Sequence, residues 1–235
     1  MWIFYTPVVN TDMELPQEEA GHCIRVLRLK EGDHILLTDG KGNFHTAVIT
    51  SAQGKRCLVH IEHSEPQKPL WSGHIHIAMA PTKLMDRNEW FVEKAVEIGV
   101  DEITFLKTEH SERDTVKMER IGKVAVAAMK QSRKAVLPIL NPVTRFRDLI
   151  EHCPDGDKFI AHCEEDDKVL LQDAVVSGHD CTVLIGPEGD FSPAEIAAAK
   201  KAGFRPVSLG PSRLRTETAA LVAVHIMNLA SQIRE

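Results

Sequence analysis

From His74 to the C-terminal end, short apolar runs alternate with stretches of helical periodicity, and this alternation restricts the possible folds more than any other feature. The runs of strand length are "HIHIAMAP", "DEITFLKT", "KFIAHC", "TVLIG" and "FRPVSLG". Helical spacing of apolar residues predicts helices over residues 87–99, 116–134, 145–153, 168–176, 192–203 and 216–233. Strands that are joined through helices run parallel, and the helices bury both faces of the sheet. We therefore expect an α/β domain with a parallel sheet between two helical layers.

The first 65 residues have a different pattern, rich in strands with one short helix. "DHILLTDGKGNFHTAVIT" predicts a hairpin whose turn is Asp39-Gly40-Lys41-Gly42, because glycine tolerates positive φ, and "KRCLVHIEH" predicts a further strand. Small β units of this kind tend to close into a barrel, which removes exposed edges. "EPQKPLWSG", with two prolines and a glycine, marks the expected boundary between this unit and the α/β domain.

Composition excludes some classes of protein and suggests a compartment. Apolar residues make up 43% of the 235 residues, enough for a sizeable core, and no apolar run reaches the length of a membrane span. The N-terminal sequence has neither a charged leader nor a small-residue cleavage site, so we expect no signal peptide. The five cysteines are scattered without a CxxC pair, which indicates reduced thiols and a cytoplasmic location.

The formal net charge of −6 conceals a strong asymmetry along the chain. Residues 105–147 hold ten Lys and Arg against four Asp and Glu, whereas residues 148–200 hold three Lys against thirteen acids. A basic segment on an acidic chain is compatible with phosphate binding on one face. A solvated helix face would explain the same charges equally well.

Two loops that contain Gly-Pro follow predicted strands. Gly186-Pro187-Glu188-Gly189 comes after "TVLI", and "LGPSRLRTET" comes after "FRPVS"; neither loop matches GxGxxG or a P-loop. In open α/β sheets ligands bind at the carboxyl ends of the strands. Two such loops at adjacent strand ends would form opposite walls of a pocket whose backbone N–H and C=O groups recognise a heterocycle. Two ordinary tight turns remain an alternative of about equal weight.

The residues after each loop begin a helix. Ser192, Pro193 and Glu195 form a predicted capping box, and Gly203 is the predicted C-terminal stop, so these residues need no further function. The second helix start differs, because Arg213 and Arg215 stand beside Glu217. Arginine opposes the positive end of a helix dipole, which suggests an anionic partner; an ion pair with Glu217 is the alternative.

These motifs resemble those of the SPOUT (trefoil-knotted) RNA methyltransferases, and more specifically the 16S ribosomal RNA (uridine-N3)-methyltransferase family. Besides "LIGPEGDFS" and "LGPSRLRTETAAL", the stretches "HCIRVLRLKEGD", "EWFVEKAVEIGVDEI" and "TEHSERD" agree, in order and over nearly the whole chain. One departure is "KQSRK" at residues 130–134, where the family often has Glu-Gln-Ser/Cys-Gly-Arg. Gln131 and Ser132 match, but the glycine is missing.

The resemblance implies a PUA-like RNA-binding β-barrel domain over residues 1–68 and a SPOUT knotted methyltransferase domain over residues 74–235. It further implies a homodimer that binds S-adenosylmethionine in the knot and methylates one uridine in the decoding region of 16S rRNA or the small ribosomal subunit. We expect no membrane and no metal; the acidic run "HCEEDD" lacks the spacing of a metal site.

The resemblance also implies roles for particular residues. The proton on uracil N3 must leave, so Glu217 is the candidate base and Arg215 or Arg113 would stabilise the anion. The expected cofactor contacts are Gly186, Pro187, Glu188, Gly189, Leu209, Gly210, Leu214, Arg215 and Thr216. The expected RNA contacts are Arg25, Arg28, Lys30, Arg113 and Arg133. The aromatic side chains Trp71, Trp90 and Phe91 are interpreted as linker and core packing rather than as platforms for stacked bases.

Three alternatives stay open at this point. The chain could be an RNA-binding module without activity, although the two intact loops argue against this. It could be a SPOUT methyltransferase with a different RNA target. A nucleotide-dependent oxidoreductase on a doubly wound fold would need GxGxxG after the first strand, which is absent.

Overall fold

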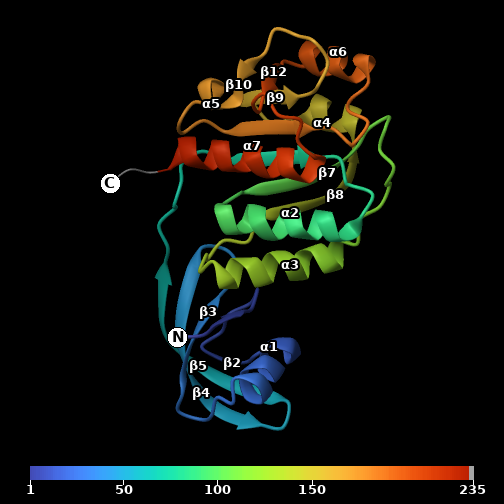
Figure 1. The fold of residues 1–235 in the computed structure, drawn as a ribbon. Coiled ribbons are helices and arrows are strands. Elements are labelled where there is room, and N and C mark those ends of the chain that lie inside the picture. Colours follow the sequence, from blue (N-terminus) through green and yellow to red (C-terminus); the bar gives the residue numbers. More distant parts are fainter. Residues whose placement is uncertain (233–235) are drawn as a thin grey trace. The chain divides into compact units, whose positions relative to one another are not determined.

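The structure is a computed structural model that describes residues 1–232. The chain divides into two compact units (Figure 1). The N-terminal unit comprises Met1–Lys68 together with Val126–Leu137, and the C-terminal unit comprises Pro69–Ala125 and the chain from Pro138 onward.

A five-stranded sheet forms the N-terminal unit. Its strands are β1 (Ile3–Tyr5), β2 (Asp12–Glu14), β3 (His34–Thr38), β4 (Asn43–Gln53) and β5 (Arg56–Pro66), in the order β1-β3-β4-β5-β2. Only β1 and β3 pair in parallel. The short helix α1 (Gln17–Gly21) continues into one turn of π-helix, η1 (His22–Val26). The core beneath them includes Phe4, Leu37 and Ile49, each at most 1% exposed.

The predicted hairpin is confirmed. Strands β3 and β4 pair antiparallel, and Gly40 and Gly42 take the left-handed conformation with φ of 72° and 103°. The Asp39 carboxylate accepts hydrogen bonds from the backbone N–H groups of Lys41 and Asn43 at 2.7 and 3.2 Å. These bonds hold the turn, as is typical of an Asx turn.

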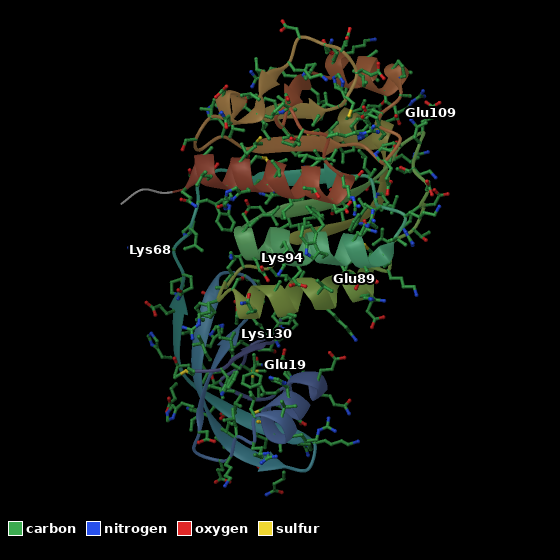
Figure 2. All side chains as sticks on the ribbon, in the orientation of Figure 1. Glu19, Lys68, Glu89, Lys94, Glu109 and Lys130 are labelled. Carbon is green, nitrogen blue, oxygen red and sulfur yellow. The ribbon has the colours of Figure 1, made fainter. Side chains whose placement is uncertain are left out.

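The second half of α3 (Met118–Gln131) belongs to the N-terminal unit although it comes far later in the chain. Lys130 Nζ donates a hydrogen bond to Glu19 Oε1 on α1 (both are labelled in Figure 2). The backbone N–H of Leu137 donates to Gly40 O at 2.9 Å, and Thr38 Oγ1 donates to Ala135 O at 3.2 Å. Side-chain and backbone contacts thus attach residues 126–137 to the hairpin turn and to α1.

The C-terminal unit contains the predicted parallel sheet, with seven strands. They are β6 (Ile75–Met79), β7 (Glu102–Lys107), β8 (Ile139–Arg145), β9 (Asp157–Ala161), β10 (Val169–Leu170), β11 (Cys181–Ile185) and β12 (Arg205–Ser208). Their order is β10-β12-β9-β11-β6-β7-β8, and every neighbouring pair is parallel. Two strands were not predicted. β8 is a partly exposed edge strand containing Pro142, and β10 lies where a helix was expected.

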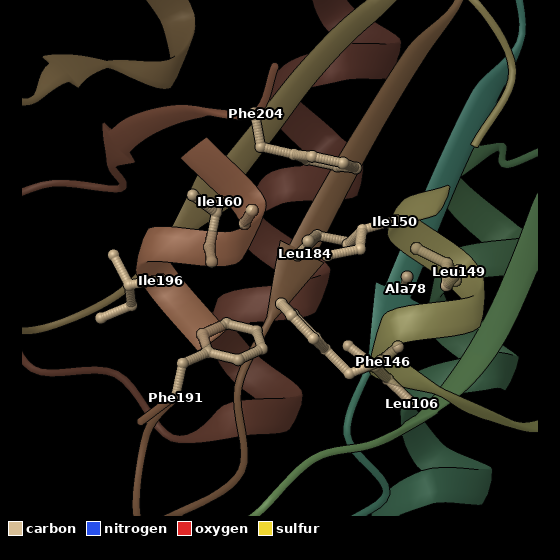
Figure 3. Close-up of a cluster of buried hydrophobic side chains, with 11 residues drawn as sticks. Ala78, Leu106, Phe146, Leu149, Ile150, Ile160, Leu184, Phe191, Ile196 and Phe204 are labelled. Carbon is tan, nitrogen blue, oxygen red and sulfur yellow. The ribbon is translucent and has the colours of Figure 1, made fainter. Parts of the chain in front are cut away.

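Helices cover both faces of this sheet. On one face α4 (Phe146–His152) and α6 (Pro193–Lys201) pack on β6, β7, β9 and β11 through a buried apolar cluster, which Figure 3 shows around Leu184. On the other face α2 (Met85–Ile98) packs against α7 (Thr216–Ser231), and α7 in turn contacts β6, β11 and α5 (Leu171–Ala174). Ile233, the last residue of the predicted final helix, lies outside the described residues.

Helix ends agree with their predicted signals. Ser192 and Glu195 form the capping box of α6, and Gly203, with φ of 91°, follows its last turn. Helix α2 ends at Gly99, whose φ of 127° no larger residue adopts easily. No helix within residues 1–232 combines the length and the apolarity that crossing a membrane requires.

The aromatic side chains divide into two groups. Trp71 packs against Gly99 and donates from Nε1 to Asp101 Oδ2 at 2.8 Å, and Phe91 is fully buried, so both are packing residues as predicted. The prediction for Trp90 was wrong, because its side chain is 42% exposed on α2. Helical spacing assigned it to the core, but the apolar face of α2 is narrower than that spacing suggested.

Candidate active site

The two Gly-Pro loops lie at the carboxyl edge of the sheet. Gly186–Asp190 follows β11, and Leu209–Arg215 follows β12. The expectation that these strands are adjacent was wrong, because β9 lies between them. The loops therefore stand on either side of the end of β9, where His162 and Cys163 follow the strand. His162 is buried, and burial lowers the pKa of its imidazole, so this position favours a neutral ring.

Two neighbouring segments hold the Gly186–Asp190 loop. The backbone N–H of Cys163 donates to Asp190 Oδ2 at 2.6 Å, and Asp190 itself takes a left-handed conformation with φ of 61°. His110 Nδ1 lies 3.1 Å from Gly189 O and 3.0 Å from Asp190 O. The bond to the Asp190 carbonyl raises the pKa of His110. The loop is thus fixed by the chain's own groups before any ligand binds.

The glycines of the loops serve different purposes. A Cβ on Gly186 would lie 3.1 Å from Phe191, and a Cβ on Gly189 would lie 3.2 Å from His110 Cβ. Both glycines therefore let other parts of the chain approach closely. Gly210 has φ of 119°, and a Cβ added to it would meet nothing within 4 Å, so its backbone stands beside open space. Of these three positions, Gly210 leaves room for a ligand.

A third loop, Ala80–Leu84 after β6, joins the same edge, and sequence analysis did not include it. The Ala80 N–H donates to Ile185 O at 2.9 Å, and the Lys83 N–H lies 3.4 Å from Glu188 Oε1. Arg113 donates from Nε to Thr82 O at 3.1 Å and from Nη2 to Lys83 O at 2.5 Å. The guanidinium of Arg113 is thus engaged in holding this loop. The signal for the loop was available, since it also follows a parallel strand.

The start of α7 carries the charged residues of the site. Arg215 is the N-cap, and its exposed guanidinium makes no hydrogen bond or ion pair with any residue that the structure describes. Glu217 is only 6% exposed. Its Oε1 lies 3.6 Å from Arg87 Nε on α2, and its buried Oε2 has no hydrogen-bond partner among residues 1–232. The alternative of an ion pair between Arg215 and Glu217 is therefore wrong, because Glu217 faces Arg87.

Four of the expected RNA contacts lie in the N-terminal unit. Arg25 is on η1, with its guanidinium folded over Gly21, while Arg28 and Lys30 follow that helix. Arg28 and Arg133 both take a left-handed conformation, with φ of 56° and 55°. Arg133 stands where the resembling motif has glycine, and the positive φ explains that glycine. A side chain kept there strains the backbone, which suggests a use for its charge.

Cavities lie elsewhere in both units. One of about 820 Å³ in the N-terminal unit is lined by the segment Pro7–Thr11 and by residues of β4 and β5. One of about 470 Å³ in the C-terminal unit lies between Lys107, Phe146 and Glu195. Neither includes a residue of the two Gly-Pro loops.

The C-terminal unit has a parallel sheet, with glycine loops and a buried carboxylate at the carboxyl edge, and a small β unit precedes it in the chain. This combination defines a class of two-domain α/β enzymes. The chain belongs to the RNA methyltransferase family. The family model described as the RNA methyltransferase domain matches residues 68–228, and the RNA methyltransferase PUA domain matches residues 15–62.

Individual relatives span nearly the whole chain. The ribosomal RNA small subunit methyltransferase E of Bacillus subtilis is 29% identical over 231 residues, covering 92% of this chain and 89% of that protein. A probable rRNA-methyltransferase from Porphyromonas gingivalis has a crystal structure that is 46% identical, with 98% of each chain covered and a TM-score of 0.94. The Neisseria gonorrhoeae ribosomal RNA small subunit methyltransferase E, bound to S-adenosyl methionine, is 29% identical over 97% of both chains, with a TM-score of 0.87.

Proposed function

We propose that this protein transfers a methyl group from S-adenosylmethionine to N3 of one uridine in 16S rRNA of the small ribosomal subunit. The observation that carries the proposal is Glu217: a buried carboxylate with one unpartnered oxygen, at the edge where three loops of a methyltransferase-family domain meet. Relatives of similar length are named as small-subunit rRNA methyltransferases, and two related structures contain S-adenosylmethionine.

The residues at this edge fit the cofactor. Among residues 1–232, nothing fills the space beside Gly210 and nothing binds the guanidinium of Arg215. Gly186–Gly189 and Leu209–Gly210 would hold the cofactor through backbone groups, with Leu214, Arg215 and Thr216 completing the site. When bound, S-adenosylmethionine supplies an electrophilic methyl group.

The chain's own residues have two tasks in this reaction. Glu217 accepts the proton that leaves uracil N3, because it is a carboxylate at the start of α7 that accepts no hydrogen bond from residues 1–232. Arg215 stabilises the negative charge that develops on the uracil. Arg113 supports both indirectly, because its guanidinium holds the Thr82–Lys83 backbone. The fixed loops also orient the reactants, which lowers the entropic part of the barrier.

The proposal is tested by offering the purified protein small-subunit rRNA and S-adenosylmethionine in the absence of metal. We expect calorimetry to show cofactor binding in a chelating buffer. Mass spectrometry should then place one new methyl group on N3 of a single uridine. Binding without transfer to any rRNA would favour an inactive RNA-binding module, and a modified base elsewhere would favour a different RNA target. No binding by a folded protein would exclude methyltransferase activity.

We also propose that the protein is a homodimer in solution. Helices α2 and α7 of the C-terminal unit expose large apolar side chains, with Trp90 at 42% and Leu229 at 55% exposure. Covering such side chains stabilises an interface by roughly 25 cal/mol per Å² of apolar surface. Light scattering at micromolar concentration should give twice the chain mass of 26.2 kDa. A mass of one chain would contradict the dimer, and Trp90→Lys should shift the protein towards monomer.

RNA affinity should fall steeply with salt although the chain is acidic overall. The expected contacts Arg25, Arg28, Lys30 and Arg133, with the basic segment 105–147, would displace counterions from phosphates. Each contact adds about 0.7 to 0.9 to the slope of log K against log salt. Filter binding or fluorescence anisotropy between about 50 and 200 mM salt gives the slope. Arg133→Gly should lower the slope without loss of folding, and a flat response would contradict RNA contact.

Two structural assignments complete the proposal. We place the domain boundary between residues 68 and 74, and we propose that the C-terminal unit is knotted, since β12 pairs with β9 whereas α7 returns to β6 and β11. A crystal structure with an unthreaded path would exclude the knot.

All five cysteines are free thiols, which supports a cytoplasmic location. Fractionation of the cell would test this location.

A further inference from the structure

The contact between Glu217 and Arg87 is too long to satisfy a buried carboxylate. Arg87 Nε lies 3.6 Å from Glu217 Oε1, outside hydrogen-bond range, and the part of the chain that the structure describes offers Oε2 no hydrogen-bond partner. Burying a carboxylate is costly unless it is paired and hydrogen-bonded. The ligand-free protein thus carries an incomplete polar network at the edge of its sheet, with one cation oriented towards one oxygen.

Arg87 is held by a rigid element. It lies in the first turn of α2, where its backbone N–H donates to Leu84 O at 3.2 Å. The next residue, Asn88, is fully buried and exchanges hydrogen bonds with the backbone of Thr82, at 2.8 and 3.1 Å. Helix α2 packs directly on α7, so this anchoring also fixes the position of Arg87 relative to Glu217.

The location of Arg87 is unfavourable for the helix that contains it. A cation in the first turn opposes the helix dipole, whereas Glu217 in the first turn of α7 suits it. Two helix N-termini therefore meet, and the acid of one faces the arginine of the other.

From this geometry we infer that Arg87 is a positioning residue for the reaction. It attracts Glu217 Oε1 and so fixes the orientation of the carboxylate that accepts the proton from the substrate. The inference rests on the proposed function, because it takes Glu217 as the base for uracil N3. Arg87 itself touches neither substrate nor cofactor in this assignment.

The test compares Arg87→Gln and Arg87→Lys with a matched control, Arg205→Gln. Arg205 also pairs with a carboxylate, Asp157 at 3.2 Å, but at the opposite edge of the same sheet. We expect Arg87→Gln to lower kcat about 10- to 100-fold, the scale of a small misplacement of a reacting group. KM for rRNA and Kd for S-adenosylmethionine should stay within about twofold of wild type, because positioning acts on the chemical step.

Arg87→Lys and Arg205→Gln distinguish an effect on the position of Glu217 from an effect on the stability of the protein. Arg87→Lys should recover part of kcat, because a point charge still attracts Oε1 but lacks the planar fork. Arg205→Gln should lower the melting temperature without a specific loss of kcat. If Arg87→Gln lowers kcat no more than Arg205→Gln does, the inference is overturned. A wild-type protein that transfers no methyl group would instead overturn the proposed function, and this inference with it.

A double variant keeps the inference testable if Arg87→Gln folds poorly. Once Glu217→Gln has removed the carboxylate, Arg87→Gln should have little further effect on the melting temperature, since coupled residues are not additive. An equal loss of melting temperature in both backgrounds would show that Arg87 does not act through Glu217, and would overturn the inference.

Discussion

Replacing Arg215 by alanine should lower the rate of methyl transfer by a factor of about 10²–10³, the usual cost of removing one donor that stabilises developing charge. The fold should not suffer. The guanidinium of Arg215 is exposed and has no partner among residues 1–232, and it does not cap α7. Surface changes of this kind shift stability by roughly 0.5 kcal/mol at most, or about 2 °C in melting temperature.

Circular dichroism melts and a radiolabelled methyl-transfer assay on the same preparations measure both quantities. Arg215→Lys should restore only part of the rate, because an ammonium group cannot reproduce a two-pronged contact. Wild-type turnover in Arg215→Ala would show that the anion is stabilised elsewhere and that the placement of the active site at the start of α7 is wrong.

Glu217→Gln should lower the rate by a factor of about 10²–10⁴, the range of general-base contributions. The substitution preserves the shape of the side chain and removes its charge. Because Oε2 has no partner and the contact with Arg87 is long, the ligand-free protein loses little, and its melting temperature should equal or exceed that of wild type. Single-turnover measurements of the methyl-transfer rate, together with thermal melts of the ligand-free protein, test these two expectations. Turnover close to wild type would mean that another group accepts the proton.

Glu102→Gln is the matched control for this prediction. Glu102 is a half-buried glutamate at the amino edge of the same sheet, where it accepts hydrogen bonds from His74 at 2.9 Å and Asn141 at 2.6 Å. The bond from His74 lowers the pKa of Glu102. Its contribution to stability is therefore present above the unfolded-state pKa, near 4.5, and is lost as the pH falls through the lower folded-state value. Glu102→Gln should lower the melting temperature at pH 7 and leave the rate of folded protein unchanged.

Sequence alone determined the features that depend on neighbours along the chain. The hairpin at Asp39–Gly42, the capping box of α6 and the stop at Gly99 follow from backbone preferences of a few residues. The alternation of strands and helices determined that the C-terminal sheet is parallel, because helical crossovers permit no other direction. The five motifs, in order along the chain, indicated the family, and the family models that match residues 68–228 and 15–62 confirmed it.

Tertiary structure decided the features that depend on contacts far apart in the chain. Periodicity did not identify β8, because an edge strand with a proline and exposed residues lacks the pattern of a buried one. It did not order β12, β9 and β11, because strand order depends on packing between elements. For the same reason local signals could not assign residues 126–137 to the N-terminal unit.

The candidate active site shows the same division at the level of single side chains. The motif around Arg215 and Glu217 was visible in the sequence, but the partner of Glu217 was not. Neighbours in sequence suggested Arg215; the packing of α2 on α7 brings Arg87, 130 residues earlier, to 3.6 Å from the carboxylate. The sequence determined which chemical groups are present at the start of α7. Only the packing of α2 on α7 decided which group faces Glu217, because electrostatic pairing follows distance in space.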